Sequence, residues 1–310
     1  MIIANPIYDT VFKKMMENER VAKFFIGTLL DQEFENIEVK PQVFTYTNEL
    51  LGLAVFRLDF IATLKLETGE LKKVLIEIQK AKNYIDLMRF RRYLGEQYKK
   101  EDVINAQKTI LPITTIYILG FKLPELETAC IKVERNYKDL VNKKIIDKKS
   151  DFIEKLSHDC YIVQVERITN RFQSSLDKLL SVFEQNHFTD DQKITKIFSH
   201  PTDNEDLKLL TGILHHSGTS PEERKILENE EEAWRTVNAA FEDKEKELVL
   251  KIKESEKIIN DKDKALEEKD KALKEKEKTL EEKNKALEEK DKALEEIKHQ
   301  LDEIKRKIGL

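Results

Sequence analysis

Two carboxylates and a glutamine stand in neighbouring apolar stretches, FRLDF (56–60) and VLIEIQKAK (74–82). Glu77 and Gln79 are two residues apart, so in a strand both side chains point to the same face. An antiparallel pairing through a turn at Gly69 brings Asp59 close to Glu77. Two carboxylates in such a place repel each other and are costly to desolvate unless a cation lies between them. Because hard oxygen ligands suit Mg²⁺ or Mn²⁺, the pattern predicts a divalent metal site.

A structural ion pair is the alternative explanation for these acidic residues. On that interpretation Glu77 pairs with Lys73 or Arg57 of the same hairpin, and no metal is bound. Acidic residues are common on strands, and the spacing between Asp59 and Glu77 has little specificity of its own. The residues alone therefore leave both interpretations open.

The elements that must position these residues follow the order helix, three strands, helix, strand. Apolar residues at helical spacing predict an amphipathic helix over 6–31, interrupted near Asn18. Stretches rich in β-branched and aromatic residues predict strands, two of them joined as a hairpin around Gly69. We therefore expect an α/β fold, a mixed sheet flanked by helices. The expected strands are 37–47, 53–66, 71–80, 111–121, 127–137 and 160–168, with helices at 84–101 and over most of 173–215.

Several of these stretches together resemble a known family. YDTVFKKMM (8–16), FRLDF, the glycine turn, LIEIQ (75–79) and MRFRRYLGEQYKK (88–100) are similar to the Rpn-type, recombination-promoting nucleases of the PD-(D/E)XK superfamily, which are also labelled transposases. The similarity covers about residues 5–185. It implies a restriction-endonuclease-like core of helix, three strands, helix and strand, which is the order expected above.

The resemblance assigns roles to individual residues. Asp59 corresponds to the motif aspartate and Glu77 to the acidic residue of the (D/E)xK motif, while Gln79 stands where the superfamily has lysine. Asp59 and Glu77 would then hold Mg²⁺, with the backbone carbonyl of Ile78 as a further ligand. Such a metal lowers the pKa of a bound water and stabilises charge on the phosphate.

Gln79 departs from the family pattern because an amide donates hydrogen bonds but carries no positive charge. Lys80 is next in the chain, and Lys65 and Lys73 lie on the same hairpin. One of these lysines taking over the missing role is a hypothesis, and the departure also allows weak or absent activity.

A local excess of cations predicts contact with DNA. Between residues 72 and 100, Glu77, Asp86 and Glu96 are the only acids, and such an excess suits contacts to phosphates. A solvated basic helix face is the alternative. The expected DNA contacts are Lys82, Arg89, Arg92 and Lys99.

The C-terminal part consists of tandem heptads such as KALEEKD. Ser220, Pro221 and Glu223 predict the start of a very long helix. Within it, apolar residues recur every seven from Ile252 to Ile308, but the accompanying d positions are lysine from Lys262 to Lys290, which makes a poor seam. The pattern predicts a dimer-capable coiled coil anchored at its tip. A solvated single helix, supported by Glu–Lys pairs four residues apart, is the alternative.

Composition limits the classes of protein to which the chain can belong. Charged residues make up 37% of the 310, yet the net charge is only −5, and a local basic face matters more than this total for nucleic-acid binding. The two cysteines favour free thiols in a reducing compartment. Neither a signal peptide nor a membrane span is expected, so the chain reads as cytoplasmic.

These observations predict a Mg²⁺-dependent DNA endonuclease that dimerises through its heptads. The alternative is a catalytically weak DNA-binding or scaffolding protein whose main activity is oligomerisation, and RNA as the substrate also stays open. The expected parts are a nuclease-like domain at 1–185, a helical extension at 186–245 and a heptad-repeat coiled-coil arm at 246–310.

Overall fold

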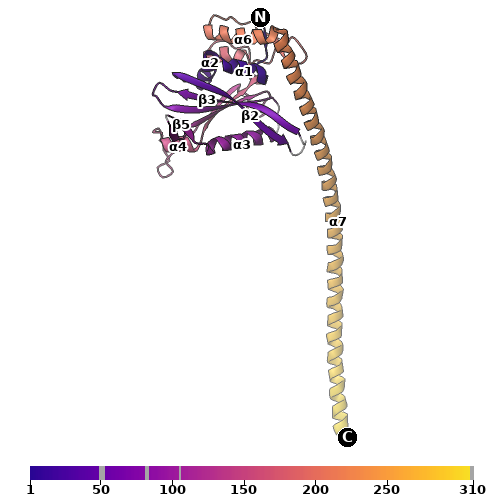
Figure 1. Ribbon diagram of the computed structural model, residues 1–310. Helices are drawn as coiled ribbons and strands as arrows, with labels where there is room; N and C mark the ends of the chain where they lie inside the picture. Colours follow the sequence, from indigo (N-terminus) through magenta and orange to yellow (C-terminus); the bar gives the residue numbers. More distant parts are fainter. Residues whose placement is uncertain (49–52, 81–83, 105, 308–310) are drawn as a thin grey trace. The chain divides into compact units, whose positions relative to one another are not determined.

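The computed structural model describes residues 1–48, 53–80, 84–104 and 106–307; within them it does not describe the side chains of 41–48, 53–59, 84–86, 89, 241, 244, 245 and 302–307. The chain divides into two compact units, Met1–Ala240 and Phe241–Leu310. The first unit contains the sheet and its covering helices (Figure 1). The second contains the remainder of one long helix.

A six-stranded mixed sheet in the order β2-β3-β4-β7-β11-β8 organises the first unit. β2, β3 and β4 form an antiparallel meander, β4, β7 and β11 run parallel, and β8 is antiparallel to β11. The parallel pairing of β4 with β7 requires a crossover, which contains α3 (Tyr84–Lys99). The bounds are β2 Asn36–Asn48, β3 Leu53–Lys65, β4 Leu71–Gln79, β7 Ile113–Leu119, β11 Asp159–Gln164 and β8 Cys130–Val133.

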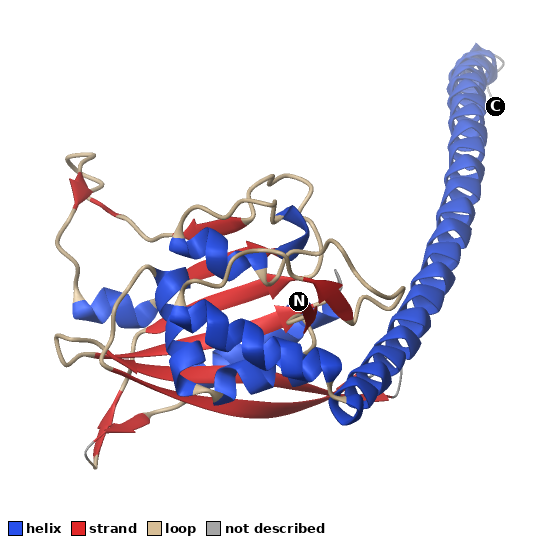
Figure 2. Ribbon diagram, turned by 90° about the horizontal axis from the view of Figure 1, so that it is seen from above, coloured by secondary structure: helices blue, strands red, loops and turns tan. Residues whose placement is uncertain are grey.

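Helices lie above and below this sheet in Figure 1, and Figure 2 views the upper layer. On one face, α1 (Asp9–Glu17) and α2 (Glu19–Leu30) pack Phe12 and Phe25 against Phe60 of β3. On the other face, Phe90 and Tyr93 of α3 pack against Ile61 and Leu75. The α/β fold class expected from the sequence, with a sheet flanked by helices and a long C-terminal helix, is confirmed.

The predicted interruption of the first helix at Asn18 is confirmed. Asn18 has extended backbone angles between α1 and α2, and its side-chain oxygen accepts the N–H of Val21 at 3.1 Å. This is the hydrogen bond of a helix N-cap. The sequence therefore starts a second helix where the first one ends.

The chain after the sheet returns to the N-terminus. β1 (Ile2–Ala4) pairs antiparallel with β12 (Thr195–Ile197), and α6 (Glu205–Thr219) packs on β1 so closely that a Cβ on Gly218 would lie 2.7 Å from the Ala4 nitrogen. The expectation of mainly helical structure over 173–215 is therefore only partly right. Besides α6 this segment has α5 (Ser175–Ser181), and β12 lies between the two helices.

Short elements complete the first unit. The predicted strand at 127–137 is limited to β8, because the chain after Val133 turns away into one small hairpin and a helix. Both cysteines, on β8 and β11, are free. The short elements are β5 Asp102–Ile104, β6 Gln107–Thr109, β9 Tyr137–Lys138, β10 Ile145–Ile146, α4 Asp151–Leu156 and a 3₁₀ turn at Val165–Arg167.

The long helix α7 runs over Pro221–Lys307, 87 residues. Its first turns belong to the first unit, where Leu227 is buried in the core. From residue 246 to residue 301 every position is exposed. Nowhere in the part of the chain that the structure describes is there a helix long and apolar enough to cross a membrane.

Candidate functional site

Glu77 and Gln79 lie near the end of β4, on the sheet face that α3 covers. They share this face with Leu75, which packs against Phe90 of α3. Glu77 is 1% exposed and pairs in register with Tyr117 of β7, and Gln79 is 6% exposed. The protein therefore holds a carboxylate and an amide, two residues apart, in its interior between sheet and helix.

Asp59 lies on β3, the strand next to β4, one residue before Phe60. β3 pairs with β4 with Phe60 opposite Ile76, and continuing this register by one residue along both strands sets Asp59 opposite Glu77. The turn that fixes the register has Gly69 at φ +82°, with the Gly69 N–H donating to the Leu66 carbonyl at 2.8 Å. The antiparallel hairpin expected from the sequence is present as far as Phe60 and Ile76, while the Asp59 side chain lies outside the described part.

Ile78 belongs to the opposite face, where its side chain is buried in the core with α1 and α2. Only the backbone carbonyl of Ile78 could therefore act as a metal ligand. Among the side chains that the structure describes, no three His, Cys, Asp or Glu residues gather closely enough to hold a metal ion. The side chain of Asp59 is not among those described.

Each of the three lysines considered for the missing charge has an acidic partner. Lys73 shares the face of Glu77 but is buried at the start of β4, and Lys80 follows the last residue of the strand. The charges of all three lysines are therefore balanced by acids that were not predicted as their partners. The pairs are Lys65 with Glu35 at 2.5 Å, Lys73 with Asp102 at 2.7 Å and Lys80 with Glu230 at 3.1 Å.

The ammonium group of Lys80 contacts two aromatic rings at the base of α7. Its Nζ is 3.7 Å from the ring centroid of Tyr8 and 5.2 Å from that of Trp234, both distances at which a cation is attracted to a ring. Burial lowers the pKa of Lys80 below the usual lysine value, and the negative charges of Glu230 and Asp9 act in the opposite direction.

Glu230 is the residue that sequence reasoning missed. Its carboxylate accepts the N–H groups of Asp9 at 2.8 Å and Thr10 at 3.1 Å, in addition to Lys80. The α1 helix begins after Tyr8, whose side chain makes no capping hydrogen bond, so α7 supplies the acceptor that the local sequence lacks. In the sequence, the only indication of this remote cap was that Tyr8, and not Ser, Thr, Asp or Asn, stands at the N-cap position of α1.

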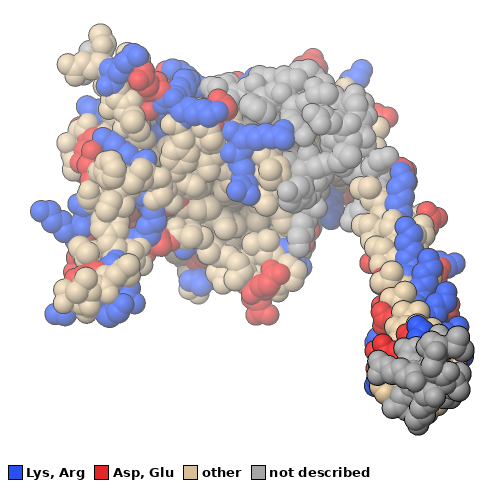
Figure 3. Space-filling model, turned by 90° about the horizontal axis from the view of Figure 1, so that it is seen from below, with Lys and Arg blue, Asp and Glu red and all other residues tan. Residues whose placement is uncertain are grey.

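The cations predicted to contact DNA lie on or before α3. Arg92 and Lys99 are exposed on this helix, and Lys99 pairs with Glu96 at 2.9 Å. Lys82 and the side chain of Arg89 lie outside the described part. Figure 3 views the first unit from the side of α3 and shows Lys and Arg in several separate clusters on it.

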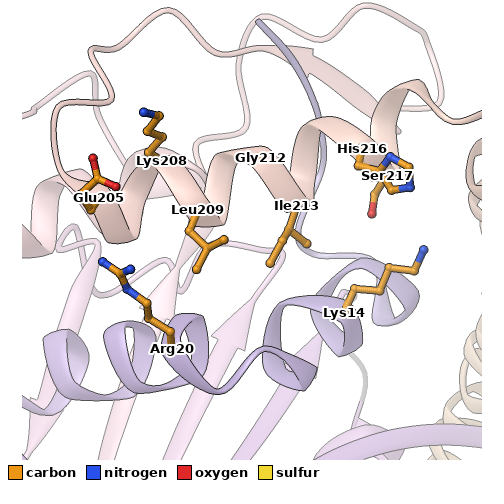
Figure 4. A pocket seen from close by; sticks show the side chains of 9 residues that line it. All are labelled: Lys14, Arg20, Glu205, Lys208, Leu209, Gly212, Ile213, His216 and Ser217. Atoms are coloured by element: carbon orange, nitrogen blue, oxygen red, sulfur yellow. The ribbon is translucent and has the colours of Figure 1, made fainter.

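A groove of about 580 Å³ lies between α6 and the pair α1–α2, on the other side of the sheet from Glu77 (Figure 4). Leu209 and Ile213 line it, with Lys14 and Arg20 at its edge. These cations are already paired, Lys14 with Glu223 and Arg20 with Asp206. The groove is therefore no part of the carboxylate site.

Lys196 is a buried cation elsewhere in the first unit. It is 2% exposed on β12, and its Nζ donates to the carbonyls of Ser181 at 3.4 Å and Glu184 at 2.5 Å. Burial lowers its pKa to about 7, against the opposing charge of Glu184. These bonds satisfy carbonyls at the end of α5, which indicates a structural role.

Comparisons of the chain with protein-family models, with curated proteins and with solved structures gave no match.

Proposed function

We propose that this chain is a Mg²⁺-dependent DNA endonuclease that hydrolyses phosphodiester bonds, of the recombination-promoting type its sequence resembles. The observation that carries the proposal is the β3–β4 register, whose outermost pair, Phe60 with Ile76, stands next to Asp59 on one strand and the buried Glu77 on the other. A carboxylate in the interior of a protein needs a compensating cation. Two carboxylates on adjacent strands, with the backbone carbonyl of Ile78 nearby, form a donor set that fits Mg²⁺ or Mn²⁺.

In this proposal each residue has a separate task. Asp59, Glu77 and the Ile78 carbonyl hold the metal ion, which lowers the pKa of a water and offsets charge on the phosphate when bound. Gln79, beside Glu77 on the same face, orients the water through its amide hydrogen bonds. Since Gln79 adds no positive charge, we expect slower cleavage than a lysine at this position would give.

The exposed cations of α3 support DNA as the substrate. Arg92 and Lys99 lie on the helix that covers the face of Glu77, where contacts to phosphates hold a duplex without reading its sequence. Two copies joined through α7 bring two such sites to one duplex, and cleavage of both strands requires two sites. The proposed partners are therefore double-stranded DNA and a second copy of this chain.

Plasmid cleavage tests the proposal. We compare the intact protein with Asp59→Asn and Glu77→Gln, in Mg²⁺ and in EDTA, with Glu67→Gln in the exposed hairpin turn as the matched control. The expected result is nicking or linearisation by the intact protein and the control in Mg²⁺ alone, and loss of both in the two site variants. Equal behaviour of all four proteins would show that the carboxylate pair does not carry the activity.

A DNA-binding or scaffolding protein with little catalysis is the second candidate. Its support is the glutamine at position 79 together with the acidic partners of Lys65, Lys73 and Lys80. Gel-shift assays on the same four proteins distinguish the two. Binding without cutting in every protein favours the scaffold, and parallel cleavage assays with RNA identify the nucleic acid.

A further inference from the structure

The second unit presents a line of apolar side chains to solvent. Residues at every seventh position from 252 to 301 are between 51% and 63% exposed, a span of about 75 Å along the helix. Scattered exposed apolar residues are ordinary, but a continuous line marks an interaction surface. Its members are Ile252, Ile259, Leu266, Leu273, Leu280, Leu287, Leu294 and Leu301.

Charges of opposite sign flank the two sides of this line. With Leu266 and its equivalents as reference, the residue three positions on lies about 60° to one side, and the residue four positions on lies about 40° to the other. The first is always lysine between 262 and 290, and the second is acidic in four of the five repeats, Asn284 being the fifth. Figure 3 shows Lys and Arg running along α7 beside uncharged atoms.

These flanking lysines lack partners for ion pairs within their own helix. Pairs form between residues three or four positions apart, and at those positions Lys269 has Ala265, Leu266, Ala272 and Leu273. The neighbours of Lys262, Lys276, Lys283 and Lys290 at these spacings are uncharged as well.

The far side of the helix differs because acids and lysines stand four residues apart on it. Lys285 lies 3.5 Å from Glu281, four residues earlier, and Glu267–Lys271 and Glu288–Lys292 have the same spacing. The flanking lysines therefore have no acid three or four positions away in their own helix, which leaves them for another molecule.

We propose that the apolar line of α7 binds a second copy of this chain, parallel and in register. In a parallel pair whose contact is centred on the apolar line, the lysine flank of one helix faces the acidic flank of its partner. In register, Lys262, Lys269, Lys276 and Lys290 then lie opposite the acid that follows each of them in the other copy. An antiparallel pair would set lysines against lysines and acids against acids, which is unfavourable.

The pairing requires a left-handed supercoil. A straight helix drifts by about 20° per heptad relative to an exact seven-residue repeat, so the line winds around α7 unless the two helices coil. Register slips of seven residues cost little within the near-identical repeats. The end of the helix fixes the register, because there Leu294, Ile297 and Leu301 form an apolar cluster that the repeats from 262 to 291 lack. The proposal gives the orientation of the dimer proposed above and is independent of cleavage.

Disulfide trapping in the full chain tests orientation and register. Ile259→Cys and Leu294→Cys are made separately; these positions are about 52 Å apart along the helix. Under mild oxidation each variant is expected to form a dimer bridged at its own position, located by peptide mapping because Cys130 and Cys160 are also present. In an antiparallel pair, at most one of the two positions lies next to the same position of the partner. A bridge between position 259 of one chain and position 294 of the other, found when the two variants are mixed, would overturn the proposal.

Charge reversal tests the flanks by sedimentation. Lys262→Glu, Lys269→Glu and Lys276→Glu in one chain make both flanks acidic, and Asp263→Lys, Asp270→Lys and Glu277→Lys in another make both basic. Each is expected to dimerise with a dissociation constant raised roughly tenfold or more, and their mixture to form a heterodimer near the wild-type affinity. A wild-type chain that is monomeric or larger than a dimer, or a mixture that stays monomeric, contradicts the proposal, and helix content by circular dichroism is the control for folding.

Discussion

Lys80 and Glu230, 150 residues apart in the chain, form an ion pair of 3.1 Å that joins the end of β4 to the base of α7. Glu230 also accepts the N–H groups of Asp9 and Thr10 at the start of α1. One carboxylate thus connects three elements of the first unit. Since Lys80 follows Gln79 directly, this junction fixes the strand end on which the proposed site depends.

Replacing Glu230 by alanine is expected to lower the free energy of unfolding by about 2 to 4 kcal/mol, because the change removes a helix cap and leaves a buried lysine unpaired. Chemical denaturation followed by fluorescence measures this, with Trp234, the only tryptophan, as the probe. Glu232→Ala, an exposed position on the same helix, is the control and should change stability by less than about 0.5 kcal/mol. Equal effects of the two substitutions would contradict the role of Glu230.

Two glycines of α6 should respond in opposite directions to alanine. A Cβ on Gly218 would lie 2.7 Å from the Ala4 nitrogen, whereas one on Gly212 would meet nothing within 4 Å. We expect Gly218→Ala to destabilise by about 1 to 3 kcal/mol through overpacking against β1. Gly212→Ala should stabilise by about 0.5 to 1 kcal/mol, because alanine favours the helix. Thermal unfolding of both variants checks this, and destabilisation by both would show that α6 does not pack as described.

Lys196 should make stability depend on pH in the alkaline range. Burial lowers its pKa to about 7 in the folded state, while in the unfolded chain it is near 10.4. Between these values the unfolded state binds more protons, so stability rises with pH, by about 2 to 3 kcal/mol from pH 7 to pH 9. Well below pH 7, Lys196 is protonated in both states, and its contribution to the free energy of unfolding no longer changes with pH.

Lys196→Met removes the titrating group, so we expect the slope between pH 7 and pH 9 to be smaller in this variant. Urea denaturation at several pH values measures the difference, and comparing slopes separates it from the constant cost of the lost hydrogen bonds to Ser181 and Glu184. Parallel curves for the two proteins would mean that Lys196 has an ordinary pKa.

Local patterns in the sequence were sufficient to locate the central strands of the sheet and the hairpin that joins two of them. The β-branched and aromatic composition of 53–66 and 71–80 located β3 and β4, and the turn at Gly69 joins them so that Phe60 stands opposite Ile76. The helix break at Asn18 was also predictable, because asparagine satisfies the first N–H groups of a helix through its own side chain.

Contacts between distant segments could not be predicted in the same way. β1 and β12 have three residues each and pair across most of the first unit, and strands this short carry too little alternation to be recognised. The acidic partners of Lys73 and Lys80 come from β5 and α7. A single sequence shows the charge of a lysine but not the remote acid that balances it, so this part of the candidate site needed the structure.

Mg²⁺ binding should stabilise the protein through Asp59 and Glu77 whether or not cleavage is fast. A ligand that binds only the folded state adds about 2.7 kcal/mol to the free energy of unfolding at one hundred times its dissociation constant. We expect the midpoint of denaturation to rise with Mg²⁺ in the intact protein and in Glu67→Gln. It should stay constant in Asp59→Asn and Glu77→Gln, because each lacks one of the two carboxylates.

This measurement separates metal binding from catalysis, which the glutamine at position 79 makes necessary. If Mg²⁺ stabilises the intact protein and not the site variants while plasmid DNA stays uncut, the carboxylate pair is a metal site and Gln79 limits the chemistry; Gln79→Lys should then restore cleavage. If Mg²⁺ stabilises all four proteins equally, the ion binds elsewhere. The buried Glu77 would then belong to an ion pair, the alternative that the sequence left open, and the scaffold would become the better account of the chain.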